Sequence, residues 1–197
     1  MRKLAALCFA TLALTACAGP SLPKQDDLVT WQRLPLAPDQ RLTDAALRST
    51  VCRSGQKDDA PIQLLLQDRR TATSAAFLVS GVGFSGSCTI ALNGGASGGS
   101  SREQPLDPLS GPIAVDERST GGLGGGTASL VGGRVAPVVA RVRIDLADGR
   151  VVDASVGNGH WLAWWPGDFA AVRIRALDLA SSIMATLDDS TPGWQQK

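Results

Sequence analysis

The chain is poor in the side chains that most often carry acid–base chemistry. It has no tyrosine, one histidine and four cysteines among 197 residues, and aromatic residues make up only 5%. With His160 alone, few groups can exchange a proton near neutral pH. Asp68 and Asp168 are interpreted as turn residues without a visible partner. We therefore expect a non-enzymatic protein, with an envelope enzyme as the less favoured alternative.

Strong charge and phosphate-binding signals are also missing. The formal net charge is +1 and no polybasic run occurs, so we expect no nucleic-acid partner. Gly121 to Gly126 (GGLGGG) lacks the Lys-Ser/Thr ending of a phosphate loop, and the strand-like TASLV follows it. No nucleotide and no cofactor are expected. His160 is the only histidine, and it lies far along the chain from Cys52 and Cys88, so these residues lack the ligand spacing of a metal site.

What is present begins with a targeting segment. Arg2 and Lys3 precede an apolar stretch, Leu4 to Leu14, which is too short to cross a hydrocarbon core of about 30 Å. Leu14-Thr15-Ala16-Cys17 then resembles the lipobox of bacterial lipoproteins. The resemblance implies that residues 1–16 are a signal peptide and that Cys17 carries a diacylglycerol. An ordinary secretory signal with an accidental cysteine is the alternative.

The predicted fold is mainly β, with antiparallel hairpins and meanders in one or two small, sandwich-like sheets. Loss of residues 1–16 would change the formal charge from +1 to −1. Residues 17–30 are predicted to be a lipidated tether, and residues 31–92 a helix plus a first β-subdomain. Residues 93–126 are predicted to be Gly/Pro-rich loops, and residues 127–190 a second β-subdomain with a meander over 138–165.

The first subdomain contains one predicted helix, near 43–54, with Thr43 as its N-cap and Cys52 in its last turn. Three strand candidates follow, over 62–67, 73–79 and 84–92. Alternation in the third places Cys88 on the apolar side. Two cysteines in an oxidising compartment favour a Cys52–Cys88 disulfide over two free buried thiols.

Two turn signals set the register of the meander. For Asp148-Gly149, a three-residue loop with a left-handed Gly149 keeps the apolar faces together and pairs Ile144 with Val152. Asn158-Gly159 suits a two-residue type I′ turn. The remaining predicted pairs are Val142–Ala154, Ala140–Val156, Val156–Trp161, Ala154–Ala163, Val152–Trp165 and Arg143–Asp153.

The same register predicts which tryptophans are buried. Trp161 and Trp165 fall on the apolar face, whereas Trp164, Leu162 and His160 fall on the charged face and form a possible contact surface. Either the C-terminal hairpin covers Trp164 or an envelope protein does, and the sequence favours the internal cover. A carbohydrate-binding module, with Trp161, Trp164 and Trp165 as stacking platforms, is the alternative function.

At the C-terminal end, Val172 to Ala176 and Ile183 to Leu187 favour a hairpin over a helix spanning 176–187. The pattern of strand, DG turn, strand, NG and AWWPG resembles a group of uncharacterised secreted or membrane-anchored actinobacterial proteins. The DRR segment at 68–70 is similar to that group more weakly. The resemblance implies a cell-envelope location and no particular activity. We expect a lipid-anchored protein on the extracytoplasmic face of the cell membrane.

Overall fold

The computed structural model describes residue 28 and residues 30–54, 60–93, 96–103 and 106–188. Within these ranges, twelve strands form three four-stranded antiparallel sheets. The first sheet has the order β1-β2-β3-β4, the middle sheet β5-β6-β10-β9 and the third sheet β12-β11-β7-β8. The predicted mainly β, antiparallel fold class is confirmed, with three sheets where one or two were expected.

The strands of the first sheet are β1 (Gln63–Arg69), β2 (Ser74–Gly81), β3 (Phe84–Ala91) and β4 (Ala96–Glu103). Those of the middle sheet are β5 (Glu117–Leu123), β6 (Gly126–Arg134), β9 (Ser155–Gly157) and β10 (His160–Pro166). The third sheet contains β7 (Arg141–Leu146), β8 (Val151–Asp153), β11 (Ala171–Leu177) and β12 (Ile183–Asp188).

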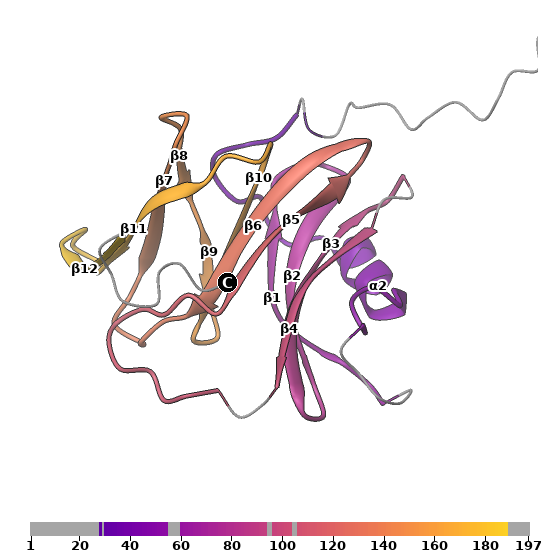
Figure 1. Ribbon diagram of the computed structural model, residues 1–197, viewed down its shortest axis with the longest axis horizontal. Coiled ribbons are helices and arrows are strands. Elements are labelled where there is room, and N and C mark those ends of the chain that lie inside the picture. The colour runs from indigo at the N-terminus through magenta and orange to yellow at the C-terminus, as the bar shows by residue number, and fades with distance from the viewer. Residues whose placement is uncertain (1–27, 29, 55–59, 94–95, 104–105, 189–197) are drawn as a thin grey trace, which may run out of the picture.

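The helix and the sheets form successive layers, with α2 on the outside of the first sheet and the middle sheet between the other two (Figure 1). Each interface holds its own apolar cluster. One cluster joins α2 to the first sheet through residues such as Leu42 and Phe77. A second joins the first and middle sheets, and a third joins the middle and third sheets around Trp161 and Trp165.

Helix α2 (Gln40–Arg48) starts earlier and ends earlier than the predicted 43–54. Asp39, not Thr43, is the N-cap, and its side chain accepts the backbone N–H of Arg41 at 2.9 Å. Short polar acceptors such as Asp favour this position because they satisfy an otherwise unpaired amide. Ser49 is the C-cap, so Cys52 lies in the turn after the helix and not in its last turn.

Both turns of the meander have the predicted geometry. Gly149 has φ +84° and its N–H bonds to Leu146 O at 3.0 Å, which closes the three-residue loop. Asn158 and Gly159 have φ +53° and +74°, the left-handed pair that a type I′ turn requires. Of the predicted pairs, Ile144–Val152, Arg143–Asp153 and Val156–Trp161 are in register.

The meander is nevertheless not a single three-stranded sheet. The strand after Gly149 breaks at Ala154, so that β8 pairs with β7 in the third sheet and β9 pairs with β10 in the middle sheet. The predicted pairs Val152–Trp165, Ala154–Ala163 and Ala140–Val156 are therefore wrong. Contacts from the first sheet to Asp153 and Ser155, described below, hold the two sides of the break.

The prediction that residues 93–126 are loops is wrong where that range contains β4 and β5. Glycine and serine are weak strand formers, but pairing with β3 and β6 supplies backbone hydrogen bonds that do not depend on side chains. The GGLGGG stretch is the β5–β6 hairpin, with Gly124 and Gly125 at positive φ. The TASLV strand, now part of β6, is confirmed.

The C-terminal hairpin is confirmed. Strand β11 pairs antiparallel with β12, with Ile174 opposite Leu187, and β11 also pairs with β7. The competing helix over 176–187 is absent from the described residues. The hairpin therefore completes the third sheet and packs on the middle sheet from the side opposite to the first sheet.

Candidate functional site

A buried ion pair lies where the first sheet meets the other two. Asp68 and Arg70 are both fully buried, with 2.8 Å between Asp68 Oδ2 and Arg70 Nε. The same carboxylate accepts the hydroxyl of Ser155 at 2.6 Å and the backbone N–H of Trp164 at 3.2 Å. Burial raises the pKa of the Asp68 carboxyl, while Arg70 and the other donors act in the opposite direction. Asp68 thus contacts both β9 and β10.

Arg70 completes this junction from its other side. Its guanidinium donates to the backbone oxygens of Gln32, Arg33 and Asp153. It also lies 5.9 Å from the ring centroid of Trp31, whose indole N–H donates to Trp164 O at 3.0 Å. Arg70 therefore joins the N-terminal segment to β8, and Trp31 extends the junction to β10.

Trp164 and Leu162 do not form the contact surface that the sequence predicted. Both are fully buried in the cluster between the first and middle sheets. Strand β10 has β6 on one side and β9 on the other, and a sheet on each face. Burial was the favoured alternative for Trp164, but the first sheet covers it and the C-terminal hairpin does not.

His160 has the ordinary role that its place beside a tight turn suggests. It is partly exposed, and its Nδ1 lies 2.8 Å from Asn158 O. Because a carbonyl oxygen only accepts, Nδ1 carries the proton and donates it. No catalytic partner of His160 is found among the described residues.

The tryptophans do not supply an exposed stacking surface. Trp161, Trp164 and Trp165 are at most 2% exposed. Each indole N–H donates to a backbone oxygen, those of Ala114, Asp68 and Phe169 respectively. A buried indole with a satisfied N–H is a packing residue. The carbohydrate-binding alternative therefore loses the side chains on which it was based.

The two stretches that carry the actinobacterial resemblance meet at the junction. Asp68, from DRR, accepts both the backbone and the indole N–H of Trp164, from AWWPG. These residues are 96 positions apart in the chain. In this chain the two stretches join the first sheet to the middle sheet. Asp68 is not the unpartnered turn residue that the sequence indicated, and its alternation with Arg70 was the signal that could have revealed the pair.

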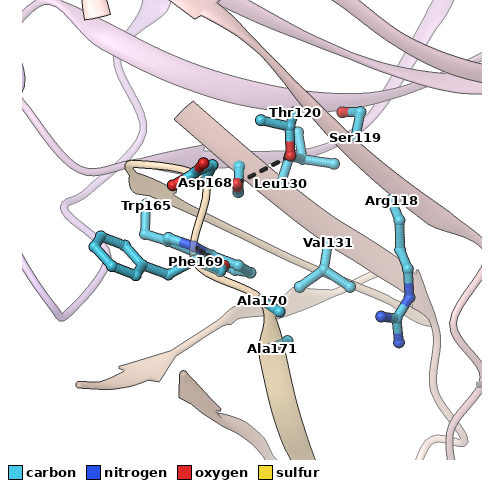
Figure 2. Close-up of a pocket in the computed structure, with 11 residues that line it drawn as sticks. Arg118, Ser119, Thr120, Leu130, Val131, Trp165, Asp168, Phe169, Ala170 and Ala171 are labelled. Atoms are coloured by element: carbon cyan, nitrogen blue, oxygen red, sulfur yellow. Dashed lines mark hydrogen bonds between the residues drawn. The ribbon is translucent and has the colours of Figure 1, made fainter. Parts of the chain in front are cut away.

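A cavity of about 370 Å³ lies beside the β5–β6 hairpin and is here called the β5–β6 groove (Figure 2). The groove lies within the range of small-molecule sites, roughly 300–1,000 Å³. Polar groups come from β5, β6 and the loop before β11, and aliphatic and aromatic side chains form the rest of the wall. The lining residues are Arg118, Ser119, Thr120, Ser129, Leu130, Val131, Trp165, Asp168, Phe169, Ala170 and Ala171.

Several hydrogen bonds hold the loop that carries Asp168 and Phe169. Ser129 Oγ donates to Gly167 O at 2.9 Å, and Trp165 Nε1 donates to Phe169 O at 2.9 Å. Gly167 has φ +94°, and a Cβ there would lie 2.6 Å from the Phe169 ring. The guanidinium of Arg150 stacks on that ring at 5.0 Å. The exposed Asp168 is therefore presented by a fixed loop.

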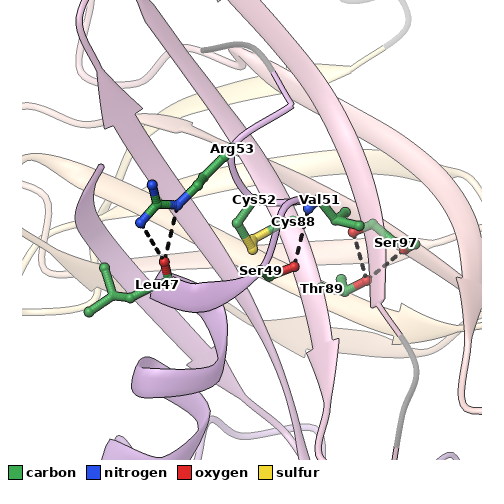
Figure 3. Close-up of a disulfide and its surroundings, with 8 residues drawn as sticks. All are labelled: Leu47, Ser49, Val51, Cys52, Arg53, Cys88, Thr89 and Ser97. Atoms are coloured by element: carbon green, nitrogen blue, oxygen red, sulfur yellow. Dashed lines mark hydrogen bonds between the residues drawn. A yellow bond between two sulfur atoms is a disulfide. The ribbon is translucent and has the colours of Figure 1, made fainter. Parts of the chain in front are cut away.

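The predicted disulfide is present. Cys52 and Cys88 are bonded, with their Cα atoms 5.2 Å apart (Figure 3). The bond ties the turn after α2 to β3, and both cysteines belong to the cluster beneath the helix. Arg53 also donates to Leu47 O, which holds the same turn against the end of the helix.

Ser97 sits in a sequence, Gly95 to Gly99, that matches the G-x-S-x-G pattern of many hydrolases. It lies within β4, and its Oγ is 2.7 Å from Thr89 Oγ1 on the neighbouring strand. The nucleophile of that pattern instead needs a sharp turn from a strand into a helix. Ser97 is therefore a cross-strand partner, and the match is accidental.

The lipidation residue Cys17, the signal peptide over 1–16 and nearly all of the tether over 17–30 lie outside the described residues. No helix in the described ranges combines the length and apolar character that a membrane crossing requires. Within the same ranges, no three His, Cys, Asp or Glu side chains gather into a set that could ligate a metal ion.

Comparison of the chain with protein-family models, with curated proteins and with solved structures found no match. What the β5–β6 groove can hold therefore has to be inferred from its own residues.

Proposed function

We propose that this protein is a non-enzymatic binding protein, anchored by lipid at Cys17 to the extracytoplasmic face of the cell membrane. The β5–β6 groove is its binding site, and its ligand is a component of the cell envelope. The open groove, lined by charges and hydroxyls on fixed backbone, is the observation that carries the binding role.

The location is supported by two independent features. Leu14-Thr15-Ala16-Cys17 has the pattern of a lipidation site. The Cys52–Cys88 bond is the kind of crosslink that persists in oxidising compartments and is rare in the cytosol. Two or more acyl chains on one residue give stable membrane association, whereas a single chain gives only reversible binding.

A binding role fits the groove better than catalysis. Its described lining residues include no histidine, cysteine or lysine. Asp168 is its one carboxylate, and the proton of the Ser129 hydroxyl is already donated to Gly167 O, so the described lining lacks the oriented base–nucleophile pair of a serine enzyme. Charged and hydroxyl groups around an apolar floor are instead typical of sites that orient a ligand.

Anchoring is tested by growing cells with radioactive palmitate. The wild-type protein should become labelled and Cys17→Ser should not, because the acyl chains have lost their attachment residue. Cys8→Ser is the matched control, since Cys8 lies within residues 1–16, and its label should be retained. Equal labelling of the wild type and Cys17→Ser would overturn the anchor.

Binding through the groove is tested on intact cells with a photo-crosslinking residue at the exposed position Ala170. The same envelope component should be captured repeatedly, and Thr120→Trp, which fills the groove from an exposed position, should abolish its capture. A crosslinker at Val82, which is 83% exposed on the β2–β3 turn, is the control. Identical capture from positions 82 and 170 would overturn the groove as the binding site.

A further inference from the structure

The two ends of the β5–β6 groove carry opposite charges. Asp168 lies at one end, next to the hydroxyls of Thr120 and Ser129, and Arg118 lies at the other (Figure 2). Val131, Ala170 and Ala171 lie between them. An elongated ligand that fills the groove would therefore meet a carboxylate first and a guanidinium last.

The hydrogen-bond donors and acceptors that are still available at the Asp168 end determine what that end can bind. The Ser129 hydroxyl has one proton, which it donates to Gly167 O. Thr120 Oγ1 lies 3.1 Å from Ser129 Oγ, so Thr120 must be the donor in that pair. Both hydroxyl protons are thus used, and the Thr120 lone pairs and the Asp168 carboxylate remain. This end offers acceptors and negative charge, which is the environment that an ammonium group requires.

The Arg118 end has the opposite character. A guanidinium has five N–H donors, no acceptor and a permanent positive charge, and its planar fork matches a carboxylate. Arg118 extends from β5 on the same face as Thr120, because strand residues two apart share a face. Its half-buried position lowers the local dielectric and strengthens its attraction for an anion.

Between the two ends, the wall is aliphatic and offers contacts to methyl groups. Val131, Ala170 and Ala171 form an aliphatic surface, and Trp165, 2% exposed, closes the floor beneath the Phe169 loop. Neutral glycans are recognised through exposed aromatic faces and through groups that both donate and accept. In this groove Trp165 is covered and the guanidinium of Arg150 stacks on the ring of Phe169, so the hydroxyls of Ser119 and Thr120 are the main groups that a neutral glycan could use.

Building on the proposed binding function, we propose that the β5–β6 groove binds a short peptide with a free amino group, a free carboxylate and methyl-sized side chains. The amino group lies at Asp168 and Thr120, and the carboxylate lies at Arg118. The loop from Gly167 to Ala170 is already held by hydrogen bonds, so little ordering is needed when the peptide binds.

The test uses the mature lipidated protein in detergent micelles, titrated calorimetrically with trialanine. Trialanine should bind, and both N-acetyl-trialanine and trialanine amide should bind at least about tenfold more weakly, because each has lost one charge-assisted contact. Asp168→Asn should remove the discrimination against the acetylated peptide and keep the discrimination against the amide. Arg118→Gln should do the reverse.

Arg173→Gln, on the outer face of β11, is the control and should leave the affinity for trialanine unchanged. Because Asp168 is exposed, its variant keeps the test valid even if Arg118→Gln fails to fold. Equal affinities for trialanine and for the peptide blocked at both ends would overturn the proposed ligand class. So would binding of a neutral cell-wall trisaccharide to the groove in the absence of trialanine binding. In that last case the groove would remain a binding site, and the proposed function would stand without the peptide.

Discussion

The two halves of the molecule hold their cores in different ways. The first sheet and α2 enclose a cluster that contains phenylalanines but no tryptophan, and the Cys52–Cys88 bond crosslinks it. The middle and third sheets have no disulfide among their described residues and enclose Trp161 and Trp165 instead. Large aromatic side chains bury much apolar area per residue. The first-sheet half has phenylalanines where the other has tryptophans, and its disulfide adds stability by restricting the unfolded chain.

The seam between the halves follows a third principle. Apolar packing of Trp164 and Leu162 against the first sheet is combined with the buried Asp68–Arg70 pair. A buried pair contributes less to stability than its Coulomb attraction suggests, because both charges lose their hydration. Its many directional bonds instead specify how the halves fit together. We therefore expect different losses of stability when the tryptophans, the disulfide or the buried ion pair is removed.

The largest effect is expected from the tryptophans. Trp164→Ala and Trp165→Ala should each lower the free energy of unfolding by roughly 3–5 kcal/mol, through lost burial and a cavity. Chemical denaturation of the mature protein measures both. Val82→Ala, at a position that is 83% exposed, should change stability by no more than about 0.5 kcal/mol. If Trp164→Ala behaved like Val82→Ala, the packing of the first sheet on the middle sheet would be wrong.

The disulfide comes next. Replacing both Cys52 and Cys88 by alanine should cost roughly 3–4 kcal/mol, because the unfolded chain regains the freedom of the closed loop. Thiol counting under denaturing, non-reducing conditions should find neither cysteine reactive in the wild type. Adding reductant should destabilise the wild type and leave the double variant unchanged. Two reactive thiols in the untreated protein would contradict the bond.

A somewhat smaller cost is expected at the seam. Asp68→Asn keeps the shape of the side chain but leaves the fully buried Arg70 without its counter-charge, which should cost about 3 kcal/mol. Adding Arg70→Met should recover part of that loss, since the second substitution removes the isolated charge. Denaturant titration of the two single variants and the double variant gives the coupling energy. Simple addition of the two single effects would show that the pair is not coupled.

The smallest effect concerns the start of α2. The Arg41 side chain, bonded to Asp39, lowers the pKa of that carboxyl to about 2. A lowered pKa in the folded state contributes stability that is present above the unfolded value of 3.8 and is lost as the pH falls through about 2. Asp39→Asn should therefore flatten stability between these two pH values and leave the fold intact. Arg41→Gln should give part of the same flattening. If the free energy of unfolding of Asp39→Asn fell between about pH 4 and about pH 2 as it does in the wild type, the role of Asp39 as the N-cap would be contradicted.

Local chemistry explains what could be predicted along the chain. The positive φ of Gly149, Asn158 and Gly159 follows from their residue types, and the registers around those turns follow from the turns. The C-terminal hairpin was predictable from alternation. The Cys52–Cys88 bond was predictable because Cys8 and Cys17 fall in the predicted signal peptide and lipidation motif, which leaves one possible pair. Each of these inferences involves residues close in sequence or a set with few possible pairings.

The assembly of the sheets was not visible in the same way. A residue can be assigned to one of two faces of a strand by alternation, but alternation does not say whether a second sheet covers the other face. Leu162 and Trp164 were placed on a charged face for that reason, and they are buried because β10 lies between two other sheets. Strands β4 and β5 were missed since glycine and serine form strands only when neighbours supply the hydrogen bonds.

The sequence by itself determined the turns, the hairpins and the identity of the disulfide partners, because these depend on short-range chemistry or on few possible pairings. Only the tertiary structure decided that the strand at Ala154 divides between two sheets, that Asp68 meets Trp164, and that Asp168 faces Arg118 across a groove. Those outcomes depend on which faces of separate sheets come together, and that choice is made by the summed packing of residues far apart in the chain.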